Sequence, residues 1–172
     1  MNANIIPWSG KFPKIADDVF VAHNATIIGD VEIASQSSVW FNAVIRGDVN
    51  FVKIGSGTNI QDGTIIHVSS DGIATIIGDN VLVGHNVLLH ACTLMSESFI
   101  GMSATVMDGA IVESHSIVAA GSLVLAGTKI RHGEVWGGIP AKFLRKVTDQ
   151  EIIDFPNQIK RYIDLSNEYK KL

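Results

Sequence analysis

Cysteine, proline, aromatic and charged residues are all scarce in this sequence. The single cysteine, Cys92, excludes an intrachain disulfide. The net charge of −4 provides no basic surface, so neither nucleic acid nor an anionic membrane is expected as a partner. The N-terminus lacks the charged start and apolar run of a signal peptide, and no apolar stretch approaches the roughly 20 residues that span a bilayer. We therefore expect a cytoplasmic protein.

The sequence is instead rich in aliphatic side chains that recur with a six-residue period. Every sixth residue from Val21 to Ile45, and again from Leu94 to Ile130, is Ile, Val or Leu. An amphipathic α-helix would repeat apolar residues near 3.6 and a lone strand at two, so neither explains the pattern. A hexapeptide period is typical of a parallel β-helix, whose short strands stack coil on coil. The alternative, a β-sandwich, does not predict a phase held over about a hundred residues.

The period predicts one domain over residues 1–172, with a β-helix over about 15–135 and a C-terminal helix over 148–171 packed on it. Thr148 and Glu151 form a capping-box signature at the start of this helix. Pro156 is expected to break or kink the helix near its start.

Three interruptions of the period are expected to lie outside the coils, because a solenoid extrudes its insertions. They are residues 47–53, residues 69–75, and a step that is one residue short between Leu89 and Leu94. Two of them lie beside histidines.

Counting three hexapeptides to a coil places His67 and His90 in register. Each follows the aliphatic marker of its coil's third strand by one residue, so their backbones should stack about 4.8 Å apart. His85 follows its own marker by two residues and falls on a different edge of the coil. It cannot easily reach the other two within one chain, but a threefold trimer would bring it to the pair of a neighbouring copy.

Three imidazoles around one divalent ion leave a coordination position for water, which is typical of catalytic zinc sites. The ion lowers the pKa of that water to about 7. The alternative for any histidine is a plain surface position, and this is the interpretation for His23, His115 and His132.

The segments that carry these residues resemble the γ-class carbonic anhydrase family, and the resemblance covers nearly the whole chain. It implies a left-handed β-helix of hexapeptide repeats with a C-terminal helix, assembled as a homotrimer. It also implies zinc, with iron or cobalt as alternatives, between subunits. The matching segments are Arg46-Gly-Asp48, Asn59-Ile-Gln-Asp-Gly-Thr-Ile-Ile-His67, Gly84-His-Asn-Val-Leu-Leu-His-Ala-Cys92 and Gly138-Ile-Pro-Ala-Lys142.

By this resemblance, His67, His85 and His90 match the metal ligands of the family. Gln61 and Asn59 match the polar groups that orient the hydroxide and the bicarbonate.

Four further positions match charged or aromatic groups of the family. Arg46 and Asp48 match a charged pair at the subunit interface, for which a structural role is as consistent as a catalytic one, and Asp62 belongs to the same network. Tyr162 lies in the C-terminal helix, where some members place an active-site tyrosine. Packing is the alternative for this residue.

The sequence departs from the family pattern at the groups that export protons. The family prototype carries a glutamate directly after the aspartate that matches Asp48, whereas Val49 stands here. The acidic loop after the first ligand is also missing. Asp71 is the candidate substitute, and slow proton export is expected.

The resemblance implies a lyase that reversibly hydrates carbon dioxide to bicarbonate. Two alternatives remain open at this stage. One is acyl transfer from coenzyme A with a single histidine as general base, which three convergent histidines disfavour. The other is a metal-binding scaffold or binding protein with weak or no hydration activity.

Overall fold

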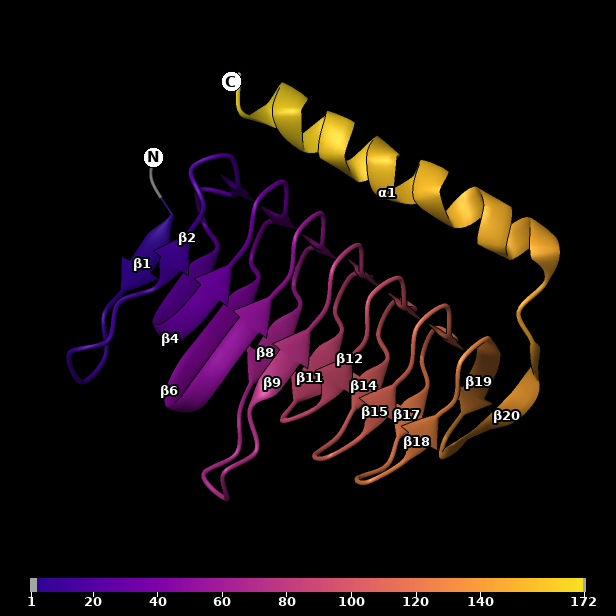
Figure 1. The fold of residues 1–172 in the computed structure, drawn as a ribbon. Coiled ribbons are helices and arrows are strands. Elements are labelled where there is room, and N and C mark those ends of the chain that lie inside the picture. Colours follow the sequence, from indigo (N-terminus) through magenta and orange to yellow (C-terminus); the bar gives the residue numbers. More distant parts are fainter. Residues whose placement is uncertain (1–2, 172) are drawn as a thin grey trace.

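The structure is a computed structural model that describes residues 3–171, and it is a parallel β-helix with one α-helix laid along it (Figure 1). The larger sheet supplies two faces of the solenoid, because β6 pairs with β8 at one end and with β9 at the other. This 12-stranded sheet contains β1 (Asn4–Ile6), β2 (Lys14–Ile15), β4 (Thr26–Ile33), β6 (Val44–Ile54), β8 (Ile65–His67), β9 (Thr75–Ile77), β11 (Leu88–His90), β12 (Thr93–Leu94), β14 (Thr105–Val106), β15 (Ile111–Val112), β17 (Leu123–Val124) and β18 (Lys129–Ile130).

The third face is an 8-stranded sheet, parallel throughout except for a final antiparallel hairpin. It contains β3 (Phe20–Val21), β5 (Ser38–Val39), β7 (Asn59–Ile60), β10 (Leu82–Val83), β13 (Phe99–Ile100), β16 (Ile117–Val118), β19 (Glu134–Gly138) and β20 (Ala141–Lys146).

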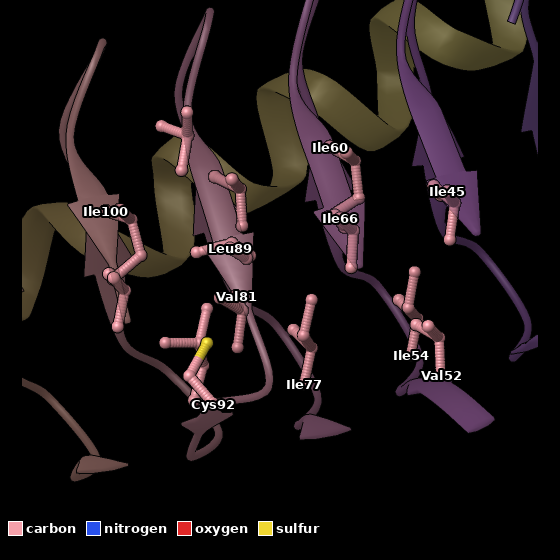
Figure 2. Close-up of a cluster of buried hydrophobic side chains, with 14 of the residues drawn as sticks. Ile45, Val52, Ile54, Ile60, Ile66, Ile77, Val81, Leu89, Cys92 and Ile100 are labelled. Atoms are coloured by element: carbon pink, nitrogen blue, oxygen red, sulfur yellow. The ribbon is translucent and has the colours of Figure 1, made fainter. Parts of the chain in front are cut away.

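The six-residue period marks the interior of the solenoid. Its aliphatic positions from Ile27 to Ile130 are at most 1% exposed. Ile45, Ile66 and Leu89 are direct partners in the ladder and stack from coil to coil (Figure 2). Each such side chain contributes about 1.5–3 kcal/mol when fully buried. Aliphatic stacking therefore accounts for the stability of the fold, as the period predicts.

Strand pairing extends beyond residues 15–135 at both ends, from β1 to β20. The loop expected over residues 47–53 is wrong, because these residues lie within β6. Gly29 pairs with Gly47 and Val31 with Val52, so the extra residues form an irregularity in a continuous strand. The second insertion does form a loop, between β8 and β9.

The C-terminal helix, α1 (Asp149–Tyr169), begins at the predicted capping box, in which Thr148 caps the Glu151 amide and the Glu151 side chain returns to the Thr148 amide. The expected break at Pro156 is wrong, since the helix continues through it. The carbonyl that loses its amide partner belongs to Ile152, which is 44% exposed, so water can satisfy it.

The helix lies along the 8-stranded sheet and contacts β3, β5 and β7 (Figure 1). Ile159 and Ser166 are its buried residues, whereas the apolar side chains of Ile152 and Tyr169 are partly exposed. Among residues 3–171, no helix is both long enough and apolar enough to cross a membrane.

Candidate metal centre

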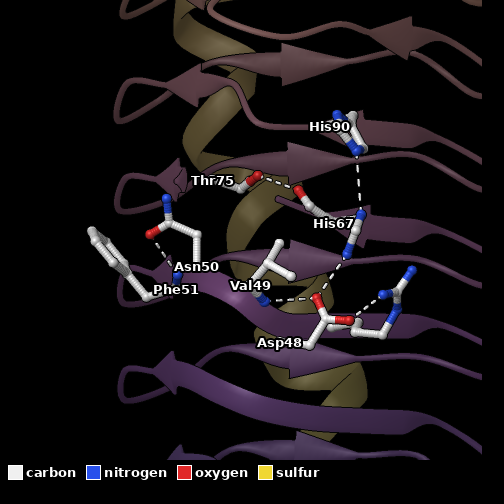
Figure 3. Close-up of polar contacts among 8 residues, drawn as sticks. Asp48, Val49, Asn50, Phe51, His67, Thr75 and His90 are labelled. Atoms are coloured by element: carbon white, nitrogen blue, oxygen red, sulfur yellow. Dashed lines mark hydrogen bonds and ion pairs between the residues drawn. The ribbon is translucent and has the colours of Figure 1, made fainter. Parts of the chain in front are cut away.

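His67 and His90 end two strands that are neighbours in the 12-stranded sheet. They are direct partners in the pairing of β8 with β11, as the period predicts. Nδ1 of His67 lies 3.2 Å from Nε2 of His90 (Figure 3). Two nitrogen ligands of a tetrahedral zinc ion, each about 2.0–2.1 Å from the metal, stand about 3.3 Å apart. The spacing therefore suits two ligands of one ion.

A carboxylate lies behind the ring of His67. Asp48 in β6 accepts hydrogen bonds from Nε2 of His67 and from the Val49 amide, each at 2.9 Å, and from the Arg46 guanidinium (Figure 3). Burial raises the pKa of Asp48, but the hydrogen bonds from His67 and Arg46 together outweigh it and lower this pKa to about 2. The ionised carboxylate holds the proton of His67 on Nε2 and leaves the lone pair on Nδ1, which faces His90.

Gly47, between Arg46 and Asp48, allows β6 to approach β4 closely. A Cβ atom on Gly47 would lie 2.4 Å from the backbone oxygen of Asp30 in the preceding coil. Any side chain here would push β6 away from β4 and displace Asp48 from the histidines.

His90 has a carboxylate of its own, which the sequence reasoning missed. Asp108 follows β14 one coil further on, and its Oδ1 accepts a hydrogen bond from Nδ1 of His90 at 2.6 Å. The available signal was the spacing, because Asp108 comes two residues after Val106, which is the ladder partner of Leu89 one coil earlier. The bond leaves the lone pair of His90 on Nε2, the atom that faces His67.

His85 lies on a different edge of the solenoid, after β10 in the 8-stranded sheet. Its Nδ1 is 2.8 Å from Oδ2 of Asp62, and both side chains are more than 40% exposed. Gln61 adjoins Asp62 on this edge and is 5% exposed. The structure therefore brings His85, Asp62 and Gln61 together, as a second group apart from the histidine pair.

Asn59 and Tyr162 lie on the face that α1 covers. Asn59 in β7 donates from Nδ2 to Ser38 Oγ at 2.8 Å, and its buried Oδ1 has no hydrogen-bond partner. Tyr162 contacts Trp40 edge to face, with ring centroids 6.1 Å apart. Neither is brought to the histidine pair within the chain.

The candidate site is thus divided between two edges of one chain. We call the group of Arg46, Asp48, His67 and His90 the pair edge, and the group of Gln61, Asp62 and His85 the single edge. Within residues 3–171, no three His, Cys, Asp or Glu side chains are placed to hold one ion together. The pair edge fits two ligands of a metal ion, and a third must come from elsewhere.

The remaining candidate groups lie outside both edges or are inert. Burial raises the pKa of the Cys92 thiol to about 12, so it is no thiolate ligand or nucleophile at neutral pH. His115 is paired with Glu97 and contacts His132 edge to face, and His23 lies against Phe41. All three stay apart from the pair edge, as expected.

No family model matches the chain. Among curated relatives, gamma carbonic anhydrase 2, mitochondrial, of Arabidopsis thaliana is 53% identical over 161 residues, which cover 91% of this chain and 58% of the relative. A carbonic anhydrase of Geobacillus kaustophilus is 40% identical, with 98% of this chain and 92% of the relative covered. The chain therefore spans less than two thirds of the plant relative but nearly all of the bacterial one.

Among solved structures, a hexapeptide transferase family protein from Anaplasma phagocytophilum superposes with a TM-score of 0.93 and 44% identity. The match covers 96% of this chain and 98% of that one. Together with the strand order, it confirms the fold expected from the sequence, a left-handed β-helix of hexapeptide repeats.

Proposed function

Since the chain belongs to the γ-class carbonic anhydrase family, we propose that it is a metal-dependent lyase that reversibly hydrates carbon dioxide to bicarbonate. The observation that carries the proposal is the pair of imidazole nitrogens 3.2 Å apart, with a carboxylate behind each ring. Two lone pairs that face each other repel unless a cation lies between them. Zinc is the proposed metal, with iron or cobalt as alternatives, because neutral imidazole suits all three.

A threefold trimer completes the site in this proposal. The pair edge of one copy would meet the single edge of the next, so that His85 supplies the third imidazole. His85 is 43% exposed and already oriented by Asp62, so it is available to a neighbouring copy. A cyclic trimer repeats the same contact three times and closes without a free edge.

The residues of the chain hold and orient the reacting groups. A divalent ion bound by three imidazoles supplies a nucleophile by making a water molecule acidic near neutral pH. Asp48 and Asp62 fix the rings of His67 and His85. Gln61 places a largely buried amide beside Asp62, where it can donate a hydrogen bond to a bicarbonate oxygen.

Three further residues have less direct roles in this proposal. Arg46 neutralises Asp48 and holds it at the subunit contact. Asn59 lies two residues before Gln61 and has an unused buried acceptor. A catalytic role for Tyr162 rests on the resemblance alone, since its ring lies against Trp40.

Stopped-flow hydration of carbon dioxide, measured on protein loaded with zinc and separately with iron(II), tests the proposal. We expect turnover that His85→Ala abolishes. Fully metallated protein without activity in either form, at any buffer concentration, would instead leave a role as a metal-binding scaffold.

One observation favours a second candidate, acyl transfer from coenzyme A. The structural neighbour from Anaplasma phagocytophilum carries the name of a transferase family. A transferase of this kind needs one histidine as a general base, whereas here each of three histidines has its own carboxylate. Assaying the same preparation for thioester consumption separates the two functions.

A further inference from the structure

Asp108 makes the shortest contact of any carboxylate with the histidines of the two edges. Its Oδ1 lies 2.6 Å from Nδ1 of His90, and the two side chains are only 33% and 31% exposed. The contact extends the polar ladder beyond the histidine pair. From coil to coil this ladder now runs through Asp48, His67, His90 and Asp108.

The backbone fixes Asp108 beside His90. The amide of Gly109, the residue after Asp108, donates to the oxygen of Ala91, the residue after His90, at 2.7 Å. Ala91 turns the corner in the left-handed region, with φ 46°, which is where the coil is one residue short. The oxygen of Asp108 accepts in turn from the Gly127 amide at 2.9 Å. The side-chain contact therefore follows from the stacking of two corners.

The chemical effect of Asp108 is on the tautomer of His90. A carboxylate only accepts hydrogen bonds, so it keeps the imidazole proton on Nδ1 and the lone pair on Nε2. Without it, the ring is free to carry its proton on Nε2, toward His67. Carboxylates behind metal-bound histidines act in this way in general, and their loss typically lowers metal affinity about 10- to 100-fold.

We infer that Asp108 is a positioning residue for His90, so that each of the three imidazoles of the metal site has its own carboxylate. This inference rests on the proposed metal site. Asp108 contacts neither the substrate nor the ion, and it acts through the ring of His90 alone.

The chain offers a matched control at a distance from the site. Glu97 contacts Nε2 of His115 at 3.0 Å, and the two side chains are 42% and 32% exposed. The pair resembles Asp108 and His90 in chemistry and exposure. His132 lies beside His115, with ring centroids 5.2 Å apart and ring planes at 90°. None of these residues belongs to the pair edge or the single edge, so Glu97→Gln leaves the proposed metal ligands and their carboxylates unchanged.

The test compares wild type, Asp108→Ala, Asp108→Asn and Glu97→Gln. Zinc affinity is measured by competition with a chelator, and the cobalt(II)-loaded protein is examined by visible absorption. We expect Asp108→Ala to bind zinc about 10- to 100-fold more weakly and to show an altered cobalt spectrum. Asp108→Asn, whose amide oxygen still accepts from Nδ1, should lose less. Glu97→Gln should match wild type, and the melting temperature and native mass should be the same in all four.

Two results would overturn the inference while leaving the proposed function intact. One is equal zinc affinity in Asp108→Ala and wild type. The other is an equal loss in Asp108→Ala and Glu97→Gln, which would show a general effect of removing a surface carboxylate. A wild-type protein that binds no metal would overturn the proposed function, and this inference with it.

Discussion

His67 and His90 are direct partners in the pairing of β8 with β11, although 23 residues separate them in the sequence. The next coil, from Leu89 to its ladder partner Val106, takes 17 residues, so the coil after His67 is six residues longer. The loop between β8 and β9 takes up the excess outside the stack, and the histidines stay in register. A metal ion shared by His67 and His90 needs both rings in register.

Replacing any one of His67, His85 and His90 with Ala should remove most of the metal and leave the β-helix folded, because buried aliphatic side chains stabilise it. Metal analysis of wild type should give one ion per chain, and light scattering should give the mass of a trimer. His115→Ala should keep its metal, since this ring is paired with Glu97 elsewhere. A wild-type monomer that retains metal would contradict the shared site.

Mixed trimers test the division of the site between copies directly. A chain with His85→Ala keeps its pair edge, and a chain with His67→Ala keeps its single edge. If the two are unfolded together and refolded, each mixed trimer should regain about one intact site in three, by the geometry of cyclic closure. Metal and activity should reappear in the mixture and be absent from either variant alone. No recovery in verified mixed trimers would place all three ligands within one chain.

The sequence predicted those features of the structure that follow from the six-residue period. An inward residue every six positions fixes the coil, and the coil fixes the register of His67 over His90, so both followed from spacing alone. Asp108 comes two residues after the marker Val106, one coil beyond His90, and was missed because the reasoning stopped at the histidines. The continuous β6 depends on a local irregularity at Gly47, which no period describes.

The sequence did not predict which face of the solenoid the helix packs against. The capping box fixed where α1 begins, but nothing in an amphipathic stripe says which face of the solenoid it covers. The burial of Asn59 and the contact of Tyr162 with Trp40 both follow from that docking. Their roles therefore depend on a tertiary contact that spacing does not encode.

Gln61→Ala should keep the metal and lower hydration efficiency. Losing one hydrogen bond to a charged group costs transition-state stabilisation of about 1–3 kcal/mol, or roughly 5- to 150-fold in kcat/KM. Metal content and hydration rate measured on one preparation check this. Gln158→Ala, on the exposed face of α1, should leave both unchanged. An unaltered kcat/KM in Gln61→Ala would remove Gln61 from the site.

Lowering the pH should destabilise the N-terminal turn of α1, because it protonates Glu151. Hydrogen bonds from the Arg145 side chain and the Thr148 amide lower the pKa of Glu151 from 4.5 to about 2. A carboxyl whose pKa is lower in the folded state stabilises that state above the unfolded pKa and loses this contribution as the pH falls through the folded one. The contribution should therefore be complete above about pH 4.5 and fade toward pH 2.

Glu151→Gln separates this effect from general acid unfolding, because glutamine keeps the capping box but carries no charge. At pH 6 the variant should be less stable than wild type by about 0.5–1 kcal/mol, since the pair with Arg145 is partly exposed. The difference between the two melting curves should shrink between pH 4.5 and 2. Asp164→Asn, which removes an exposed pair with Lys160 on the same helix, should change stability far less. A difference that is constant with pH would contradict the role of the charge.

Proton export should limit the turnover of this protein. Val49, directly after Asp48, is 56% exposed, and the nearby loop offers only the exposed carboxylate of Asp71. Hydration releases one proton per cycle, so a site without a relay depends on buffer to carry it away. Imidazole-type buffers should therefore raise kcat with their concentration until it saturates, while Val49→Glu should raise kcat at low buffer and weaken this dependence. If Asp71 is the substitute relay, Asp71→Asn should lower kcat only at low buffer concentration. The defect of Gln61→Ala should persist at every buffer concentration, because it affects the reaction at the carbon atom and not the export of the proton. A wild-type kcat that does not respond to buffer would mean that another group on the chain already exports the proton.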